Sequence, residues 1–244
     1  MTDPFGRAIH DFHRGEQTEP LIDRDGDETR KHTIEEFYFD EHTPEDWFEP
    51  RVDGPLLDMG AGAGRDALYV QERVETVAID PSEHLVETMG ERGVDDARVG
   101  DMFALREQFG RSRFGAALAI GSQLQLAASQ HTLRRFLADL AFVTTADATA
   151  MLDGYDPERA VDAGVFGVRE DPTPGLAYRV FHCEYEGDVG RTLLFRLFDV
   201  DRLREATVGT PWEVVGARHR RLHDDEPSVM WRALLEKPAE SSAR

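Results

Sequence analysis

The 244-residue sequence has one cysteine, two lysines and no apolar stretch near the roughly 20 residues that a membrane-spanning helix needs. The lone Cys183 excludes an internal disulfide, a multi-cysteine zinc site and an iron–sulfur cluster. The first residues are acidic and polar, whereas a secretory signal is basic and then apolar. We therefore expect a cytoplasmic protein that does not bind a membrane.

The scarcity of lysine accompanies a large excess of acidic over basic residues. Apart from Lys31 and Lys237, all the basic residues are arginines, and 28 basic residues stand against 48 acidic ones, for a net charge of −20. Acids dispersed along a lysine-poor chain are typical of halophilic proteins, with an ordinary acidic protein from a GC-rich genome as the alternative. Either way, the field repels phosphate backbones and anionic lipid, so we expect no nucleic-acid partner.

Hydrophobic residues make up 40% of the chain, enough for the core of one domain. Residues 1–33 are polar and charged with little periodicity, and they predict a loosely ordered N-terminal arm. Residues 33–50 place five aromatic side chains among acids, which favours one or two short helices packed on the entrance to a domain. The domain itself is expected over residues 34–237, followed by a frayed tail at 238–244.

From residue 55 onward, short apolar runs alternate with segments of helical periodicity. Five strand-like runs separated by helices predict a parallel sheet covered on both faces. Right-handed crossovers would bring the carboxyl ends of all five strands to one edge of that sheet. The five runs are residues 55–60, 75–80, 96–101, 114–121 and 148–156.

The pattern changes after the fifth run. Residues 156–175 are rich in proline, glycine and charge, and they predict a loop. Two strand-like runs within 176–199, joined by a turn at 188–190, predict a β-hairpin inserted before a short helix. The remaining runs, 210–222 and 228–237, predict two final strands.

A glycine-rich turn follows the first strand-like run at Asp58–Gly64, with the spacing D-x-G-x-G-x-G. Gly60 can take the backbone angles of a tight turn, Gly62 leaves bare backbone beside a ligand, and Gly64 permits close packing of helix on strand. Dinucleotide-binding proteins instead use G-x-G-x-x-G, where helix N–H groups meet a pyrophosphate. An acid beside the turn suits a ligand with a charged amino acid in place of phosphates. A purely structural strand–helix turn is the alternative.

Two further acids stand at strand ends. Asp80 ends the second run, 20 residues after Gly60, the reach at which a carboxylate meets ribose hydroxyls in a doubly wound fold. Asp101 ends the third run, where it could accept from an adenine amino group while Met102 or Phe103 packs on the ring. Single acids at such places are common because aspartate caps helices. Three of them behind successive strands predict a nucleoside-binding edge.

These motifs, in this order, resemble the class I S-adenosylmethionine (SAM)-dependent methyltransferase family over residues 45–237. The resemblance implies a doubly wound α/β fold whose seven-stranded, mainly parallel sheet has its last strand antiparallel between the fifth and sixth. It also implies an enzyme that transfers a methyl group from SAM. The matching segments are DMGAGAG (58–64), VAID (77–80), VGDMF (99–103), FGAALAIGSQLQL (114–126), MLDGYDP (151–157) and the two final strands.

The resemblance also implies which residues bind the cofactor. The glycine turn would surround the methionine part, the acid after the second strand would hold the ribose with Ser82 at its edge, and the residues after the third strand would flank adenine. The residues after the fourth strand would pass beneath the reactive sulfur. The full set is Asp58, Gly60, Ala61, Gly62, Gly64, Asp80, Pro81, Asp101, Met102, Ile120 and Gly121.

The methyl acceptor is less well defined. Tyr38 or Phe39 is a candidate for closing the site, with ordinary core packing as the alternative, and the hairpin at 176–199 stands where small-molecule methyltransferases build a lid. The sequence after the fourth strand lacks the Asp/Asn-Pro-Pro-aromatic motif of enzymes that methylate planar amides, and no Pro-Cys pair supports a cytosine C5 mechanism. Candidate acceptor contacts, each with a structural alternative, are Gln123, Gln125, Tyr155, Asp156 and His182.

No metal site is expected. The pairs His10/His13 and His219/His223 have chelating spacings but lie in charged, loop-like sequence, where solvated side chains are the default. A basic cluster at Arg218, Arg220 and Arg221 balances local acids or binds an acidic substrate.

A small-molecule acceptor is the leading hypothesis. A SAM-binding regulator without turnover and a tRNA or protein methyltransferase remain as alternatives. An NAD(P)-dependent oxidoreductase is disfavoured by the glycine spacing. The sequence does not define the oligomeric state.

Overall fold

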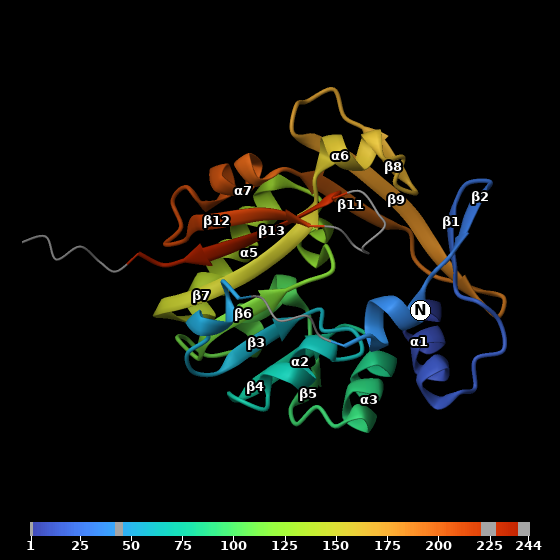
Figure 1. Ribbon diagram of the computed structural model, residues 1–244, viewed down its shortest axis with the longest axis horizontal. Helices are drawn as coiled ribbons and strands as arrows, with labels where there is room; N and C mark the ends of the chain where they lie inside the picture. Colours follow the sequence, from blue (N-terminus) through green and yellow to red (C-terminus); the bar gives the residue numbers. More distant parts are fainter. Residues whose placement is uncertain (1, 42–45, 221–227, 239–244) are drawn as a thin grey trace, which may run out of the picture.

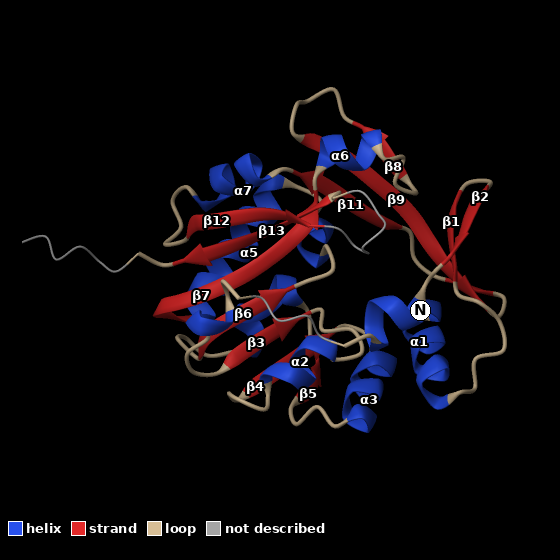
Figure 2. Ribbon diagram, viewed as in Figure 1, coloured by secondary structure: helices blue, strands red, loops and turns tan. Residues whose placement is uncertain are grey.

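The computed structural model describes residues 2–41, 46–220 and 228–238, which form two β-sheets (Figures 1 and 2). A seven-stranded sheet with helices packed on it occupies the left of the view, and a six-stranded antiparallel sheet stands at the right. No helix in this described part of the chain is long and apolar enough to cross a membrane. Of the tail expected at 238–244, all but Pro238 lies outside the described residues.

The larger sheet has the spatial order β12-β13-β7-β6-β3-β4-β5. Strands β3 to β7 are parallel, while β13 lies between β7 and β12 and runs antiparallel to both. The expected doubly wound sheet, with its inserted last strand, is thereby confirmed. The strands are β3 (Leu56–Met59), β4 (Thr76–Asp80), β5 (Ala97–Val99), β6 (Phe114–Ala119), β7 (Thr144–Tyr155), β12 (Glu213–Arg220) and β13 (Met230–Glu236).

Helices cover both faces of this sheet because its strands are apolar on both sides. In β3, Leu57 and Met59 pack in the same core cluster as α4, α5 and α7, whereas Leu56 faces the opposite side with residues of α2. Ser129 begins α5 by accepting a hydrogen bond from the Thr132 N–H. The helices are α2 (Arg65–Val70), α3 (Glu83–Arg92), α4 (Leu105–Gln108), α5 (Gln130–Val143) and α7 (Val200–Thr207).

The second sheet is built around the long strand β9, which pairs with β1, β8, β10 and β11. The hairpin expected at 176–199 is present as β9 and β11. Its turn, however, lies at Glu186 and Gly187, both with positive φ, before the expected residues 188–190. The strands are β1 (Ile22–Asp25), β2 (Glu28–Lys31), β8 (Val168–Glu170), β9 (Leu176–Tyr185), β10 (Asp188–Val189) and β11 (Leu193–Phe198).

Two stretches that were expected to be irregular are ordered. Residues 2–33 contain helix α1 (Pro4–Arg14), capped at its start by Asp3, and the β1–β2 hairpin. Residues 156–175 contain helix α6 (Pro157–Asp162) and strand β8. The prediction of a loose arm and a loop was wrong because these short elements depend on distant partners. Strands β1 and β8 pair with β9, and α1 packs on α3 (Figure 1).

The aromatic segment at 33–50 forms two short helical turns in its described part. A π-helical turn, η1 (Glu35–Phe39), and a 3-10 turn, η2 (Glu49–Arg51), flank the residues outside the described set. Tyr38 and Phe39 pack against the cluster that also contains Ile9 of α1 and Phe181 of β9. Two more 3-10 turns, η3 (Met102–Ala104) and η4 (Gln123–Ala127), follow β5 and β6. The expectation of short helices packed on the domain therefore agrees with the described residues.

Candidate functional site

A cavity of about 840 Å³ lies between the carboxyl ends of strands in the larger sheet and the second sheet. The residues after β3, β4 and β6 and the end of β7 line one side of it. Residues of α1, β2, η1, β9 and β11 line the other. A volume of this size is typical of pockets for small organic ligands.

The glycine turn forms part of the cavity wall. Gly60, Gly62 and Gly64 have φ values of 70°, 59° and 79°, which side chains rarely tolerate. Gly60 and Gly62 line the cavity together with Ala61. Gly64 does not line it; a Cβ there would lie 2.7 Å from Cγ2 of Val94. The turn thus exposes backbone to the cavity at its first two glycines and packs against the core at the third, as the spacing predicted.

Asp58 is the penultimate residue of β3, just before this turn, and is 2% exposed. Its Oδ2 atom has no hydrogen-bond partner within the described residues. Burial raises the pKa of this carboxyl well above its usual range, and the charge of Asp66 adds to the effect despite the nearby Arg65. A buried acceptor without a donor is costly. Since Asp58 lines the cavity, a ligand with a positively charged donor would fit it.

Asp80 ends β4 on the same side of the cavity. Its carboxylate accepts hydrogen bonds from the Ser82 N–H at 2.9 Å and from the Gly62 N–H at 3.2 Å. Burial raises the pKa of Asp80 to about 6, although these two bonds oppose the shift. A carboxylate has about four acceptor positions, so the side chain keeps capacity for ligand hydroxyls. Pro81 and Ser82 also line the cavity.

The two residues expected at adenine are not part of the cavity wall. Asp101 is exposed and caps η3 by accepting from the Phe103 N–H at 2.8 Å. Met102 is 6% exposed and belongs to the core cluster on the α5 face of the sheet. Neither lines the cavity. Their adenine-binding role stays a prediction, and the capping role of Asp101 alone accounts for its place after the strand.

Some of the residues after β6 line the cavity, whereas Gln125 is buried in the core. Ile120, Gly121 and Gln123 line the cavity, and the Gln123 side chain lies so close to Gly60 that a Cβ there would come within 2.8 Å of its Cγ. Gln125 is instead fully buried. Its amide donates to the Tyr155 carbonyl at 2.8 Å and accepts from the Tyr155 N–H at 3.0 Å. Gln125 therefore fixes the end of β7 and is not available to an acceptor.

The other acceptor candidates divide in the same way. Tyr155 is 6% exposed and lines the cavity. Asp156 caps α6 and lies 3.0 Å from His219 Nε2. His182 sits on the opposite face of β9 from Arg179 and Cys183, which line the cavity, and contacts Glu184 at 3.1 Å. The alternation of β9 thus removes His182 as an acceptor contact.

Sequence reasoning missed a hydrogen-bonded chain from the N-terminal segment. Nδ1 of His32 lies 3.1 Å from both oxygens of Asp23, and the Tyr38 hydroxyl lies 3.4 Å from Nε2 of His32. His32 and Tyr38 line the cavity. The pairing of β1 with β2 brings Asp23 beside His32, and no local motif marks this contact.

Asp23 is fully buried and also contacts Arg30 at 3.2 Å and the Cys183 thiol at 3.4 Å. Burial opposes its ionisation, but the hydrogen bond from His32 and the charges of His32, Arg30 and Arg179 together lower the pKa of Asp23. An ionised Asp23 only accepts, so His32 must carry a proton on Nδ1. In its neutral form, His32 would then present an unprotonated Nε2 to Tyr38. Burial raises the pKa of the Tyr38 hydroxyl and keeps it protonated.

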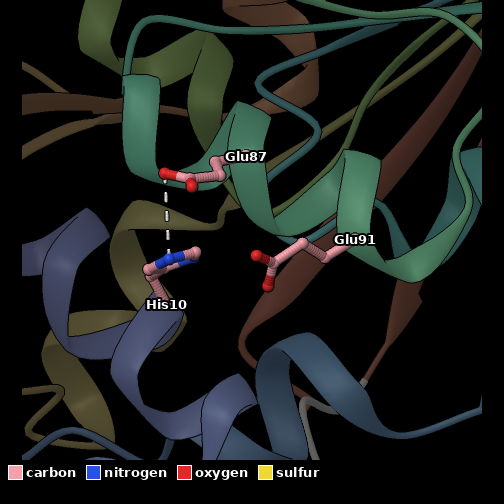
Figure 3. Close-up of side chains that lie close together, drawn as sticks. All are labelled: His10, Glu87 and Glu91. Atoms are coloured by element: carbon pink, nitrogen blue, oxygen red, sulfur yellow. Dashed lines mark ion pairs between the residues drawn. The ribbon is translucent and has the colours of Figure 1, made fainter.

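A second group of possible metal ligands joins α1 to α3. The ligand atoms of His10, Glu87 and Glu91 lie within 4.8 Å of one another, and His10 points toward Glu87 (Figure 3). His10 is buried by the packing of these helices, contrary to the expectation of a solvated side chain, and its Nδ1 contacts Thr88 at 2.8 Å. Arg14 pairs with both glutamates. The cluster thus forms an interhelical ion-pair network between α1 and α3.

The basic cluster near the C-terminus is described only in part. Arg218 pairs with Asp46 at 3.0 Å, in line with the balancing of local acids. Arg220 lines the cavity. Arg221 and His223 lie outside the described residues.

Solved structures of other proteins share the fold of this chain, although sequence comparisons find no match. No protein-family model and no curated protein sequence matches the chain. A structure of a SAM-dependent methyltransferase from Bacteroides fragilis, in complex with S-adenosyl-L-homocysteine, is similar over 96% of this chain and 94% of that one, with a TM-score of 0.74 and 23% identity.

Two further structures are similar over smaller parts. A 1,6-didemethyltoxoflavin-N1-methyltransferase from Burkholderia thailandensis has a TM-score of 0.52 and 18% identity over 75% of this chain and 70% of that one. A sugar N-methyltransferase from Streptoalloteichus has a TM-score of 0.52 and 15% identity over 76% and 81%. These likenesses establish that the chain has the fold of SAM-dependent methyltransferases.

Proposed function

We propose that this protein is a SAM-dependent methyltransferase that acts on a small molecule. The observation that carries the proposal is the convergence of three features in one cavity. They are the bare glycine turn, the unpartnered buried oxygen of Asp58 and the Asp80 carboxylate with spare acceptor capacity. The fold of the neighbouring solved structures supports the same assignment.

The residues present fit the cofactor. Asp58 would accept from the ammonium group of the methionine part, Asp80 would hold the ribose hydroxyls, and the backbone at Gly60–Gly62 would lie against the ligand. When bound, SAM supplies a methyl group activated by a sulfonium centre. The protein then has to bind and align the acceptor and, where the acceptor carries a proton, to remove it.

Proton removal is assigned to His32. Its Nε2 is oriented by the buried Asp23 and faces the Tyr38 hydroxyl. An acceptor hydroxyl or ammonium at Tyr38 would pass its proton to the Tyr38 oxygen as Tyr38 passes its own to His32. Such a chain favours a catalytic role over a purely regulatory one, because a sensor has no need of a base.

Two observations favour a small acceptor. The second sheet encloses the side of the cavity opposite the glycine turn, and the net charge of −20 disfavours nucleic acid. Two of the structural neighbours are named for 1,6-didemethyltoxoflavin and for a sugar, both small molecules, which supports the same class here.

An S-adenosylhomocysteine-release assay tests the function. The protein is incubated with SAM and the low-molecular-mass fraction of a cell extract, or with nucleic acid and protein fractions of that extract. We expect release with the small-molecule fraction, and at least a tenfold higher KM for SAM in Asp80→Asn. Asp201→Asn, on the exposed face of α7, is the matched control. SAM binding without release from any fraction would indicate a regulator, and release with RNA or protein alone would overturn the small-molecule assignment.

A further inference from the structure

Arg179 is a buried cation in the wall of the cavity. It lies in β9, is 6% exposed, and its side chain is on the face of the strand that carries Phe181 and Cys183. Burying a guanidinium is costly unless it is paired and hydrogen-bonded. Its partners in the described residues therefore indicate whether a ligand completes the site.

The described residues supply an acceptor for only a small part of the hydrogen-bonding capacity of this guanidinium. Nε donates to the Phe166 carbonyl oxygen at 2.9 Å, and no carboxylate of the described residues forms an ion pair with Arg179. Asp23 interacts with it electrostatically, but the oxygens of Asp23 already accept from His32 and Arg30. An arginine has five N–H donors, so the two terminal NH2 groups remain for a ligand.

Four other arginines of the cavity wall differ in this respect, because each is paired with an acid. Arg7 pairs with Glu186 and Asp188, Arg30 with Asp23, Arg65 with Asp66 and Arg232 with Asp153. Among these five arginines, Arg179 is the one whose charge the described chain leaves without an ion-pair partner.

Aromatic rings hold the Arg179 guanidinium in place. Its Cζ lies 4.6 Å from the ring centroid of Phe181, 5.2 Å from that of Tyr155 and 5.8 Å from that of Phe195. The guanidinium thus lies over aromatic rings, which leave its terminal N–H groups without conventional acceptors in the part of the chain that the structure describes. These groups match a carboxylate, which can accept two parallel N–H bonds.

We infer that the acceptor is a small organic carboxylic acid whose carboxylate binds Arg179. The inference rests on the proposed function and adds the chemical class of its substrate. One cation balances one carboxylate, and the surrounding Tyr155, Phe181 and Phe195 suit an aryl or alkyl body. A phosphate, with nearly two charges, would call for a second unpaired cation beside Arg179, whereas Arg30 and Arg232 of the same cavity wall are each paired with an aspartate.

Calorimetry on the wild-type protein saturated with S-adenosylhomocysteine tests this directly. Benzoate, phenylacetate and butyrate are each titrated beside their primary amides, which keep the shape without the charge, and phenyl phosphate serves as the phosphate probe. We expect at least one carboxylate to bind at least tenfold more tightly than its amide and than phenyl phosphate. Binding of no carboxylate, equal binding of acid and amide, or preference for phenyl phosphate would overturn the inference.

Variants of Arg179 assign the preference to this residue. Arg179→Gln should abolish the preference for acid over amide while S-adenosylhomocysteine affinity stays at the wild-type value, and Arg179→Lys should keep part of it. Arg196→Gln is the matched control, because Arg196 lies on the paired strand, stacks on Tyr178 and pairs with Asp171 outside the cavity.

Thermal melts establish that each variant is folded. A folded Arg179→Gln protein that still prefers the acid would contradict the inference. If Arg179→Gln fails to fold, the role of Arg179 is decided by comparing acid and amide binding in the wild-type and Arg179→Lys proteins. If the wild-type protein does not bind S-adenosylhomocysteine at all, the proposed function itself is refuted. Failure of the carboxylate inference and failure of the proposed function are therefore distinguishable.

Discussion

At the scale of single residues, the cavity is marked by charged groups that the fold buries without fully compensating. One carboxylate oxygen of Asp58 accepts no hydrogen bond from the described part of the chain, and burial raises the pKa of Asp80. Arg179 has no ion-pair partner among the described residues. Perturbed buried groups of this kind gather at functional sites because a ligand supplies the missing interactions. Both acids lie at the glycine turn, and the cation lies across the cavity on β9.

The raised pKa of Asp80 makes cofactor binding depend on pH. Ribose hydroxyls donate to the ionised carboxylate, so affinity should be full above the pKa of about 6 and should fall as pH drops through it. At pH 5 about a tenth of the free protein is ionised at this position, and SAM should bind about tenfold more weakly than at pH 7.5. Calorimetry across this range measures the effect. Asp80→Asn should bind weakly at every pH; a wild-type affinity independent of pH would remove Asp80 from the site.

Replacing His32 separates proton removal from cofactor binding. Glutamine keeps a polar group near Asp23 but has no basic nitrogen, so His32→Gln should lower kcat at least about a hundredfold on the active extract fraction. The Kd for S-adenosylhomocysteine should change by less than about threefold, since His32 is assigned to the acceptor. His182→Gln, on the opposite face of β9, should leave both values unchanged. Full turnover by His32→Gln would exclude His32 as the base.

The sequence predicted which residues after each parallel strand lie at the cavity. It did not predict the cavity residues that distant segments of the chain contribute. Asp58, Gly62 and Asp80 could be placed because parallel strands end at one edge. His32 and Arg179 could not, since the β1–β2 register and the alternation of β9 decide which side chains face the cavity. For Asp101 the sequence does not separate two roles, since a cap on η3, which the structure has, and an adenine contact, which stays a prediction, look alike in sequence.

At the scale of elements, the glycine turn couples the cavity to the packing of α3. Gly64→Ala should lower the free energy of unfolding by at least about 2 kcal/mol, because a left-handed φ of 79° combines with a Cβ 2.7 Å from Val94 Cγ2 and 2.9 Å from Met89 Cγ. Gly15→Ala has a similar φ of 70° with nothing within 4 Å, so it measures backbone strain alone. Urea unfolding of both proteins gives the difference. Equal losses would show that close packing at Gly64 is unimportant.

The elements of the larger sheet were predictable, whereas those of the second sheet were predictable only in part. Strands buried on both faces give continuous apolar runs such as Leu56–Met59, which are visible without tertiary information. Strand β2 (Glu28–Lys31) has four exposed residues and no such signal. Helix α1 is in fact strongly amphipathic, with Ala8 and Ile9 on its buried side, and this signal was overlooked amid its charged residues. For β2, by contrast, pairing with β1 creates the order that the local sequence does not specify.

At the scale of the whole molecule, charge should govern stability. With a net charge of −20, the acidic side chains repel one another in the folded state, and salt screens that repulsion. We expect the melting temperature to rise by several degrees between about 0.1 and 2 M KCl, with most of the rise at the lower concentrations, where the screening length changes fastest. Differential scanning calorimetry measures this. A melting temperature independent of KCl would contradict both the electrostatic argument and the halophilic interpretation.

The central claim is that the cavity between the two sheets binds SAM through the glycine turn and Asp80. Isothermal titration calorimetry of the wild-type protein and of Asp80→Ala, with SAM and with NAD⁺, tests it most directly. The account predicts one SAM per chain, no NAD⁺ binding, and a loss of at least about 1–2 kcal/mol of SAM-binding free energy in Asp80→Ala. Tight NAD⁺ binding without SAM binding, or unchanged SAM affinity in the variant, would contradict it.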